Sequence, residues 1–276
     1  MRLFLRTESR SVLWPASGEP DCVTAELTPE GPLSRYVQRI RIGRDDFPAP
    51  IVEHVLPDGA VHLFFELGDN VRALAMGATS APTPVQLAGK LEQVGLQLRP
   101  GGVAAILGVP ASALNGHVVP LTDLWGPVAN DVLERVGAAP VHARAAIIVE
   151  ALRERLASNE ASDRRAAESV RRIIRSRGTM PVRDLADALG IGERRLEQLF
   201  RREVGLSPKA LSRVTRFRAT IDFVHEAPTR SWAEVAQACG FYDQAHLVNE
   251  FRALAGVAPG KLAEFGFLQD GSGGAR

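Results

Sequence analysis

Six polar side chains in the segment 194–202 are of the types that recognise nucleic-acid bases and phosphates. They surround three apolar residues at helical spacing, Leu196, Leu199 and Phe200. The six are Arg194, Arg195, Glu197, Gln198, Arg201 and Arg202. Arginine pairs with guanine, glutamine with adenine, and glutamate accepts from cytosine N4, each good contact discriminating by about 1 to 3 kcal/mol. On one helix, residues near the start would reach bases, whereas Arg201 and Arg202, near the end, would meet phosphates.

A second segment repeats this arrangement with less positive charge. Its apolar stripe consists of Leu247, Val248 and Phe251. Its polar face consists of Asp243, Gln244, His246 and Asn249. The position of Asp243 is typical of a helix N-cap, where its carboxylate satisfies free backbone N–H groups. We expect the first segment to supply most of the affinity for DNA and the second to refine specificity.

Both segments lie within a longer repeat, residues 184–209 and residues 234–260. Five residues of the first copy have counterparts in the second. These are Ala186, Gly190, Phe200, Gly205 and Pro208, matched by Ala236, Gly240, Phe251, Gly256 and Pro259. Each copy has a short helix, a glycine in the position that ends it, and a second amphipathic helix. The pattern predicts two helix-turn-helix units.

The segment Pro208 to Glu226 joins the two units and has apolar residues three and four apart, which predicts a helix. About 18 residues at about 1.5 Å per residue span roughly 27 Å. That length would hold two reading helices about one duplex turn apart, roughly 34 Å, so that they meet successive major grooves. A sharp kink at Arg216 or Arg218 would destroy this fit.

Positive charge is concentrated in one part of the chain, although the formal net charge is only +1. Between Arg164 and Arg218 there are 15 Lys and Arg against 6 Asp and Glu. A charge run by itself is more often a solvated helix surface. Together with the repeat, it favours a polyanionic partner for this part of the chain.

These residues and their order resemble the AraC/XylS family of bacterial transcriptional regulators, over Arg164 to Leu268. Gly205-Leu206-Ser207-Pro208 and Gly256-Val257-Ala258-Pro259 stand where the family has its G-x-x-P turns. The resemblance implies a seven-helix domain that binds double-stranded promoter DNA and recruits or positions RNA polymerase. It marks as base-facing the positions of Arg194, Glu197, Gln198, Gln244, Ala245, His246 and Asn249. Glu197 and Ala245 depart from the common family pattern.

The first half of the chain predicts an α+β domain. Ile51 to Pro57 and Ala60 to Leu67 flank a Pro-Asp-Gly turn, which predicts a β-hairpin. Val85 to Ala88 and Val94 to Leu98 predict two further short strands, and helices are expected beyond Gly102. The stretches LPDGAVHLFFELGD, LRPGGVAAILGVPASAL and VVPLTDLWG resemble a sensor-type domain of unassigned ligand that accompanies some of these regulators. The resemblance implies a partly β, barrel-like fold.

The chain is therefore predicted to be α+β, with a mixed, β-barrel-like N-terminal domain and an all-α domain of two helix-turn-helix units joined by a long helix. The predicted divisions are a regulatory domain at 1–160, a DNA-binding domain at 161–268 and a disordered tail at 269–276. Residues 157–163 are small and polar, as in a linker. A homodimer and a small-molecule effector are possible partners.

The alternative is a small-molecule-binding or metal-dependent barrel protein whose helical tail does not read DNA. His54 and His62 could face one another across the hairpin beside Glu53 or Glu66, but no His-x-His pair is present. No nucleophile or phosphate-loop motif is found either. We expect no enzyme activity and no cofactor.

Two further expectations concern the core and the cellular compartment. Trp14 and Trp125 could line an apolar pocket, although core packing is the more common role. No apolar run approaches the roughly 20 residues that span a bilayer, and the N-terminus lacks the features of a secretory signal. We expect a cytoplasmic protein without a membrane segment.

Overall fold

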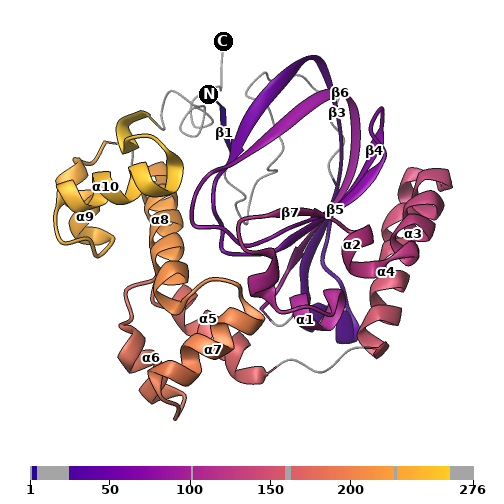
Figure 1. The fold of residues 1–276 in the computed structure, drawn as a ribbon. Coiled ribbons are helices and arrows are strands. Elements are labelled where there is room, and N and C mark those ends of the chain that lie inside the picture. Colours follow the sequence, from indigo (N-terminus) through magenta and orange to yellow (C-terminus); the bar gives the residue numbers. More distant parts are fainter. Residues whose placement is uncertain (1, 5–24, 101, 159–162, 227–228, 262–276) are drawn as a thin grey trace.

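The computed structural model describes residues 2–4, 25–100, 102–158, 163–226 and 229–261 (Figure 1). Trp14, the predicted boundary near residue 160 and the predicted tail lie outside these residues. We call the described part up to residue 158 the sheet domain and residues 163–261 the helical domain. This order of a sheet-rich domain and a helical domain confirms the predicted fold class.

The sheet domain is built on one seven-stranded sheet with the strand order β1-β3-β6-β4-β5-β7, and β2 pairs with β3 at the side. The strands are β1 (Arg2–Phe4), β2 (Ala25–Leu27), β3 (Val37–Val55), β4 (His62–Gly68), β5 (Arg72–Met76), β6 (Thr83–Leu98) and β7 (Val118–Pro120). All neighbours are antiparallel except β1 and β3. The long strands β3 and β6 pair along most of their length and form the framework of the sheet.

The predicted hairpin is wrong. The strand before the Pro-Asp-Gly turn is the end of β3, which pairs with β6, whereas β4 after the turn pairs with β5 and β6. The turn itself is present, because Asp58 Oδ1 accepts a hydrogen bond from Ala60 N at 3.0 Å. The two strand segments predicted at Val85–Ala88 and Val94–Leu98 belong to a single strand, β6.

One face of the sheet packs against helices. Leu63, Phe65 and Leu67 of β4 are at most 3% exposed and belong to the main hydrophobic core. In Figure 1 the covering helices lie around the lower and right-hand sides of the sheet. They are α1 (Gly102–Leu107), α2 (Thr122–Trp125), α3 (Pro127–Ala138) and α4 (Val141–Ser158). Trp125 is buried in this core, as expected, and its Nε1 donates to the Ile106 carbonyl at 3.2 Å.

Of the seven helices that the resemblance implies for the helical domain, the described residues contain six. They are α5 (Arg164–Arg175), α6 (Val182–Ala188), α7 (Glu193–Glu203), α8 (Pro208–Glu226), α9 (Trp232–Ala238) and α10 (Gln244–Ala255). Helix α8 is continuous through Arg216 and Arg218, so the chain does not leave the helix at either residue. At about 1.5 Å per residue its 19 residues span roughly 28 Å. Figure 1 shows α6 and α7 near one end of α8 and α9 and α10 near the other.

The two domains share one buried core. A short 3-10 helix, η2 (Ala111–Leu114), and α1 both contact α7. A Cβ on Gly59, in the turn before β4, would come within 2.4 Å of Leu211 Cδ1 on α8. A Cβ on Gly205 would come within 3.1 Å of the Ala111 carbonyl oxygen. The first helix-turn-helix unit is therefore packed closely against the sheet domain.

Candidate nucleic-acid interface

Helix α7 separates its polar and apolar residues onto different faces. Leu196 and Phe200 are fully buried and Leu199 is 4% exposed. All six polar residues that the sequence singled out on this helix are exposed: Arg194, Arg195, Glu197, Gln198, Arg201 and Arg202. The sequence folds in this way because an apolar residue recurs every three to four positions, which produces one buried stripe along a helix. The opposite face is free to meet a partner.

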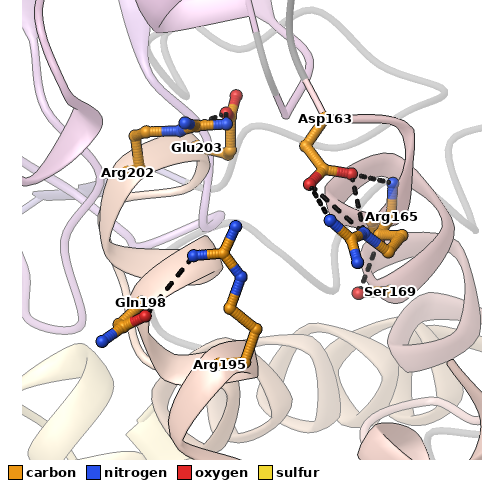
Figure 2. A network of polar contacts seen from close by, with 7 residues as sticks. All are labelled: Asp163, Arg165, Ser169, Arg195, Gln198, Arg202 and Glu203. Carbon is orange, nitrogen blue, oxygen red and sulfur yellow. Dashed lines mark hydrogen bonds and ion pairs between the residues drawn. The ribbon is translucent and has the colours of Figure 1, made fainter. Parts of the chain in front are cut away.

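Three of the side chains at this face make contacts within the protein (Figure 2). Arg202 forms an ion pair with its neighbour Glu203, with Nη2 2.6 Å from Oε1. Glu203 is only 1% exposed, so Arg202 compensates a buried carboxylate and is not a free cation at the end of α7. Arg195 Nη1 donates to Gln198 Oε1 at 3.5 Å, a long contact that another hydrogen-bond partner can replace.

Helix α10 has the same division of faces. Leu247 and Phe251 are fully buried, Val248 is half-buried, and Gln244, Ala245 and Asn249 are exposed. The N-cap predicted for this helix is confirmed. Asp243 Oδ1 accepts from His246 N at 2.7 Å. The aspartate therefore stabilises the helix start, where its negative charge interacts favourably with the positive end of the helix dipole.

His246 is less available than its position in the sequence suggested. It is half-buried, its ring packs edge-on against Phe241 at 5.5 Å between centroids, and its Nδ1 accepts from Tyr242 N at 3.3 Å. Only the other ring nitrogen is left to meet a partner outside the chain. His246 therefore has a structural role at the start of α10 in addition to any contact with a ligand.

Sequence reasoning missed Tyr242. This side chain is 92% exposed and lies one residue before the cap of α10. A single exposed aromatic side chain is common on protein surfaces, so it is the position of Tyr242 beside the polar residues of α10 that makes it a candidate contact. An aromatic residue directly after Gly240-Phe241, in the turn between two predicted helices, was the signal that could have revealed it.

The structure also fixes α10 against α8. Arg213 of α8 forms an ion pair with Glu250 of α10, with Nε 2.7 Å from Oε2. Phe217 of α8 and Phe251 of α10 pack edge to face with centroids 4.8 Å apart. Apolar and polar contacts thus bind the second unit to the connecting helix.

Residues 185–264 match a family model described as a helix-turn-helix domain. The C-terminal part of the chain is an AraC-type helix-turn-helix domain. Residues 25–120 match a second model, a domain of unknown function (DUF6597). The AraC-type domain supports a role for the chain in DNA binding and transcription regulation.

Solved structures show distant similarity to most of the chain. ToxT from Vibrio cholerae matches with a TM-score of 0.44 and 13% identity, covering 86% of this chain and all of that one. ToxT bound to (E)-4-(8-methylnaphthalen-1-yl)but-3-enoic acid matches with a TM-score of 0.45 and 11% identity, covering 84% and 99%. The AraC-like transcriptional activator CuxR matches with a TM-score of 0.21 and 16% identity, covering 75% and 79%. No curated protein matches the sequence.

The histidines considered for a metal site are not brought together as supposed. His54 lies near the end of β3 and His62 is the first residue of β4, and these two strands do not pair. His62 Nε2 instead lies 2.8 Å from Asp58 Oδ2, and both side chains are buried. Within the described ranges, no group of three or more His, Cys, Asp or Glu is placed to hold a metal ion. No helix among the same residues is long and apolar enough to cross a membrane.

Proposed function

We propose that this regulator binds promoter DNA by placing α7 and α10 in two successive major grooves. The observation that carries the proposal is the division of faces on both helices. Each buries most of its apolar stripe and leaves exposed most of the polar residues that can pair with base edges. A single helix with this pattern would be consistent with many kinds of interface. Two such helices joined by one connecting helix are the arrangement expected for a protein that reads two grooves of a duplex.

The length of α8 supports this arrangement. The roughly 28 Å of helix is comparable to the roughly 34 Å between equivalent points of successive major grooves. A single chain then covers the two half-sites for which many helix-turn-helix proteins need a dimer. We propose base contacts from Arg194, Glu197 and Gln198 on α7 and from Gln244, Ala245, His246 and Asn249 on α10. Arg195 and Arg201 would add phosphate contacts.

We further propose that a ligand of the sheet domain modulates DNA binding. Asp58 is held in a buried polar cluster with His62, and Gln97 Nε2 donates to the same Asp58 oxygen at 3.4 Å. The next residue, Gly59, lies directly against Leu211 of α8. A ligand that rearranged this cluster would therefore act on the connecting helix through a single turn. The same proposal includes RNA polymerase as a partner, the formation of a homodimer and a cytoplasmic location.

Salt dependence tests the proposal. Binding to an operator selected by the protein from random-sequence DNA should weaken about 100-fold or more as salt rises from about 50 to about 200 mM, because several phosphate contacts release counterions. The double variant Arg194→Glu/Arg201→Glu should abolish binding. Arg153→Glu, which changes an exposed arginine of α4 in the same way, should leave binding intact. An affinity that did not change with salt, or equal losses in both variants, would contradict a DNA-reading role for α7.

A further inference from the structure

The loop that leads into the first helix-turn-helix unit touches the second unit directly beside α8. Gly178, after α5, has a φ of +72°, and a Cβ there would come within 2.1 Å of the Ser212 carbonyl oxygen of α8. Gly240, in the turn between α9 and α10, has a φ of +74°, and a Cβ there would come within 2.8 Å of Thr179 Cγ2. The loop of residues 178–179, which connects α5 to the first unit, is therefore packed against both α8 and the turn of the second unit.

Arg216 connects these two loops from the middle of α8. Its Nη2 donates to the Gly178 carbonyl at 2.8 Å, and its Nη1 donates to the Gly240 carbonyl at 3.3 Å. The guanidinium also lies over the ring of Phe241, 5.5 Å from the centroid. Because the guanidinium is planar and its donors have fixed directions, both carbonyls must keep their places relative to α8. A lysine ammonium lacks this geometry.

The contact continues from Arg216 to the start of α10. Phe241, under the guanidinium, is 7% exposed and packs against the ring of His246. His246 in turn accepts a hydrogen bond from the backbone of Tyr242. A chain of packed groups that begins at Arg216 therefore determines the position of the exposed residues at the start of α10, beginning with Gln244.

We propose that Arg216 is a positioning residue that fixes the distance and the angle between α7 and α10 and so selects the spacing of the two half-sites on DNA. This inference rests on the proposed function. When two binding units are linked, the affinity gained from the second depends on how well their geometry matches the two sites. A rigid pair binds one spacing tightly, whereas a loose pair binds that spacing less tightly and tolerates others.

The test compares the wild-type protein with Arg216→Lys, which retains the positive charge. The DNA is an operator selected by the wild-type protein from a random-sequence library, together with versions in which one or two base pairs are inserted between the half-sites. Each half-site is also measured alone. We expect Arg216→Lys to lose about 10-fold or more in affinity for the intact operator. It should keep wild-type affinity for each half-site and show a smaller penalty for the insertions.

Arg230→Lys is the matched control, because Arg230 lies over the ring of Phe223 at 4.9 Å but is not among the residues that bridge the two units. It should retain the wild-type spacing preference. The active fraction of each protein is titrated at high DNA concentration. Correcting the affinities for this fraction removes any contribution from unfolded protein. The inference is overturned if Arg216→Lys weakens each half-site as much as the whole operator, or leaves the spacing preference unchanged. Failure of the wild-type protein to select any operator would instead overturn the proposed function itself.

Discussion

Positive charge at the end of α7 is not equally available for phosphate contacts. Arg201 is exposed and makes no ion pair with any residue that the structure describes, whereas Arg202 is paired with the buried Glu203. Arg201→Ala should therefore lower affinity about equally on all DNA sequences and reduce the salt slope by about 1. Arg202→Ala should change the slope less and instead lower the free energy of unfolding, because it leaves the Glu203 carboxylate buried without its partner.

Fluorescence anisotropy over a salt series, on the operator and on unrelated DNA, measures the first effect, and urea unfolding measures the second. Equal salt slopes in Arg201→Ala and Arg202→Ala would show that the Glu203 ion pair opens when DNA binds. The assignment of a structural role to Arg202 would then be wrong.

Gln198 is expected to read a base. Its side chain is exposed, and its hydrogen bond from Arg195 Nη1 has the long distance of 3.5 Å. Gln198→Ala should lose about 1 to 3 kcal/mol of discrimination at one base pair and leave the preferences at other positions unchanged. Operators substituted singly at every position provide the measurement. Gln237→Ala, at an exposed position of α9, is the control and should alter no base preference.

At the residue scale, the sequence predicted which side chains of α7 and α10 are exposed, because the 3.6-residue period determines the faces of a helix. It could not predict how those side chains pair. The contact of Arg202 with Glu203 joins adjacent residues, which do not usually face each other on a helix. The half-burial of His246 depends on Phe241, whose position is set by α8 through Arg216. Such details follow from packing between elements.

At the scale of elements, helix α5 depends on its N-terminal cap. Asp163 Oδ1 accepts from Arg165 N at 2.9 Å, and the same carboxylate pairs with the Arg165 guanidinium at 2.7 Å (Figure 2). The hydrogen bond from the Arg165 side chain holds the pKa of Asp163 below its usual value of about 3.8. Since the pKa is lowered on folding, this stabilisation is fully present above pH 3.8 and is lost as the pH falls through the lower value of the folded state.

Asp163→Ala should therefore lower the free energy of unfolding at pH 7 by about 1 kcal/mol, the usual value of a helix cap. Asp163→Asn should cost less, because asparagine also caps helices but does not pair with Arg165. Urea unfolding of the three proteins at neutral and at acid pH measures the differences. The wild-type protein should lose its advantage over Asp163→Asn in acid. A difference that persisted below the pKa of Asp163 would mean that the charge is not its source.

The helices were easier to predict than the strands for a physical reason. Each helix carries its own signals, such as Asp163 before α5 and Asp243 before α10, and its hydrogen bonds are local. A strand is completed by partners far along the chain. The turn at Asp58 was correctly recognised, but one of the two partners of β4 is β6, more than twenty residues away, and no local signal specifies that choice.

At the scale of the whole molecule, the sequence suggested two domains joined by a linker, whereas in the described residues the main buried core extends through both domains. Val103, Ile106 and Leu114 of the sheet domain belong to the same cluster as Phe200 and Leu211 of the helical domain. This contact is not visible in the sequence, because both surfaces are apolar stripes that could equally serve the core of their own domain. It means that the first helix-turn-helix unit is stabilised in part by the sheet domain.

Leu211 is the residue that tests this coupling. It is 4% exposed and packs against Gly59 of the sheet domain, so Leu211→Ala should create a cavity at the domain interface and cost about 2 to 5 kcal/mol. Hydrogen exchange should then become faster in β4 as well as in α8.

Ile221→Ala is the matched control, because Ile221 is equally buried in the same helix but lies nearer its other end. It should affect the amides of the helical domain and leave those of β4 protected. Unchanged protection of β4 in Leu211→Ala would mean that the two domains are stable independently, and a ligand bound to the sheet domain would then lack this route to the DNA-reading helices.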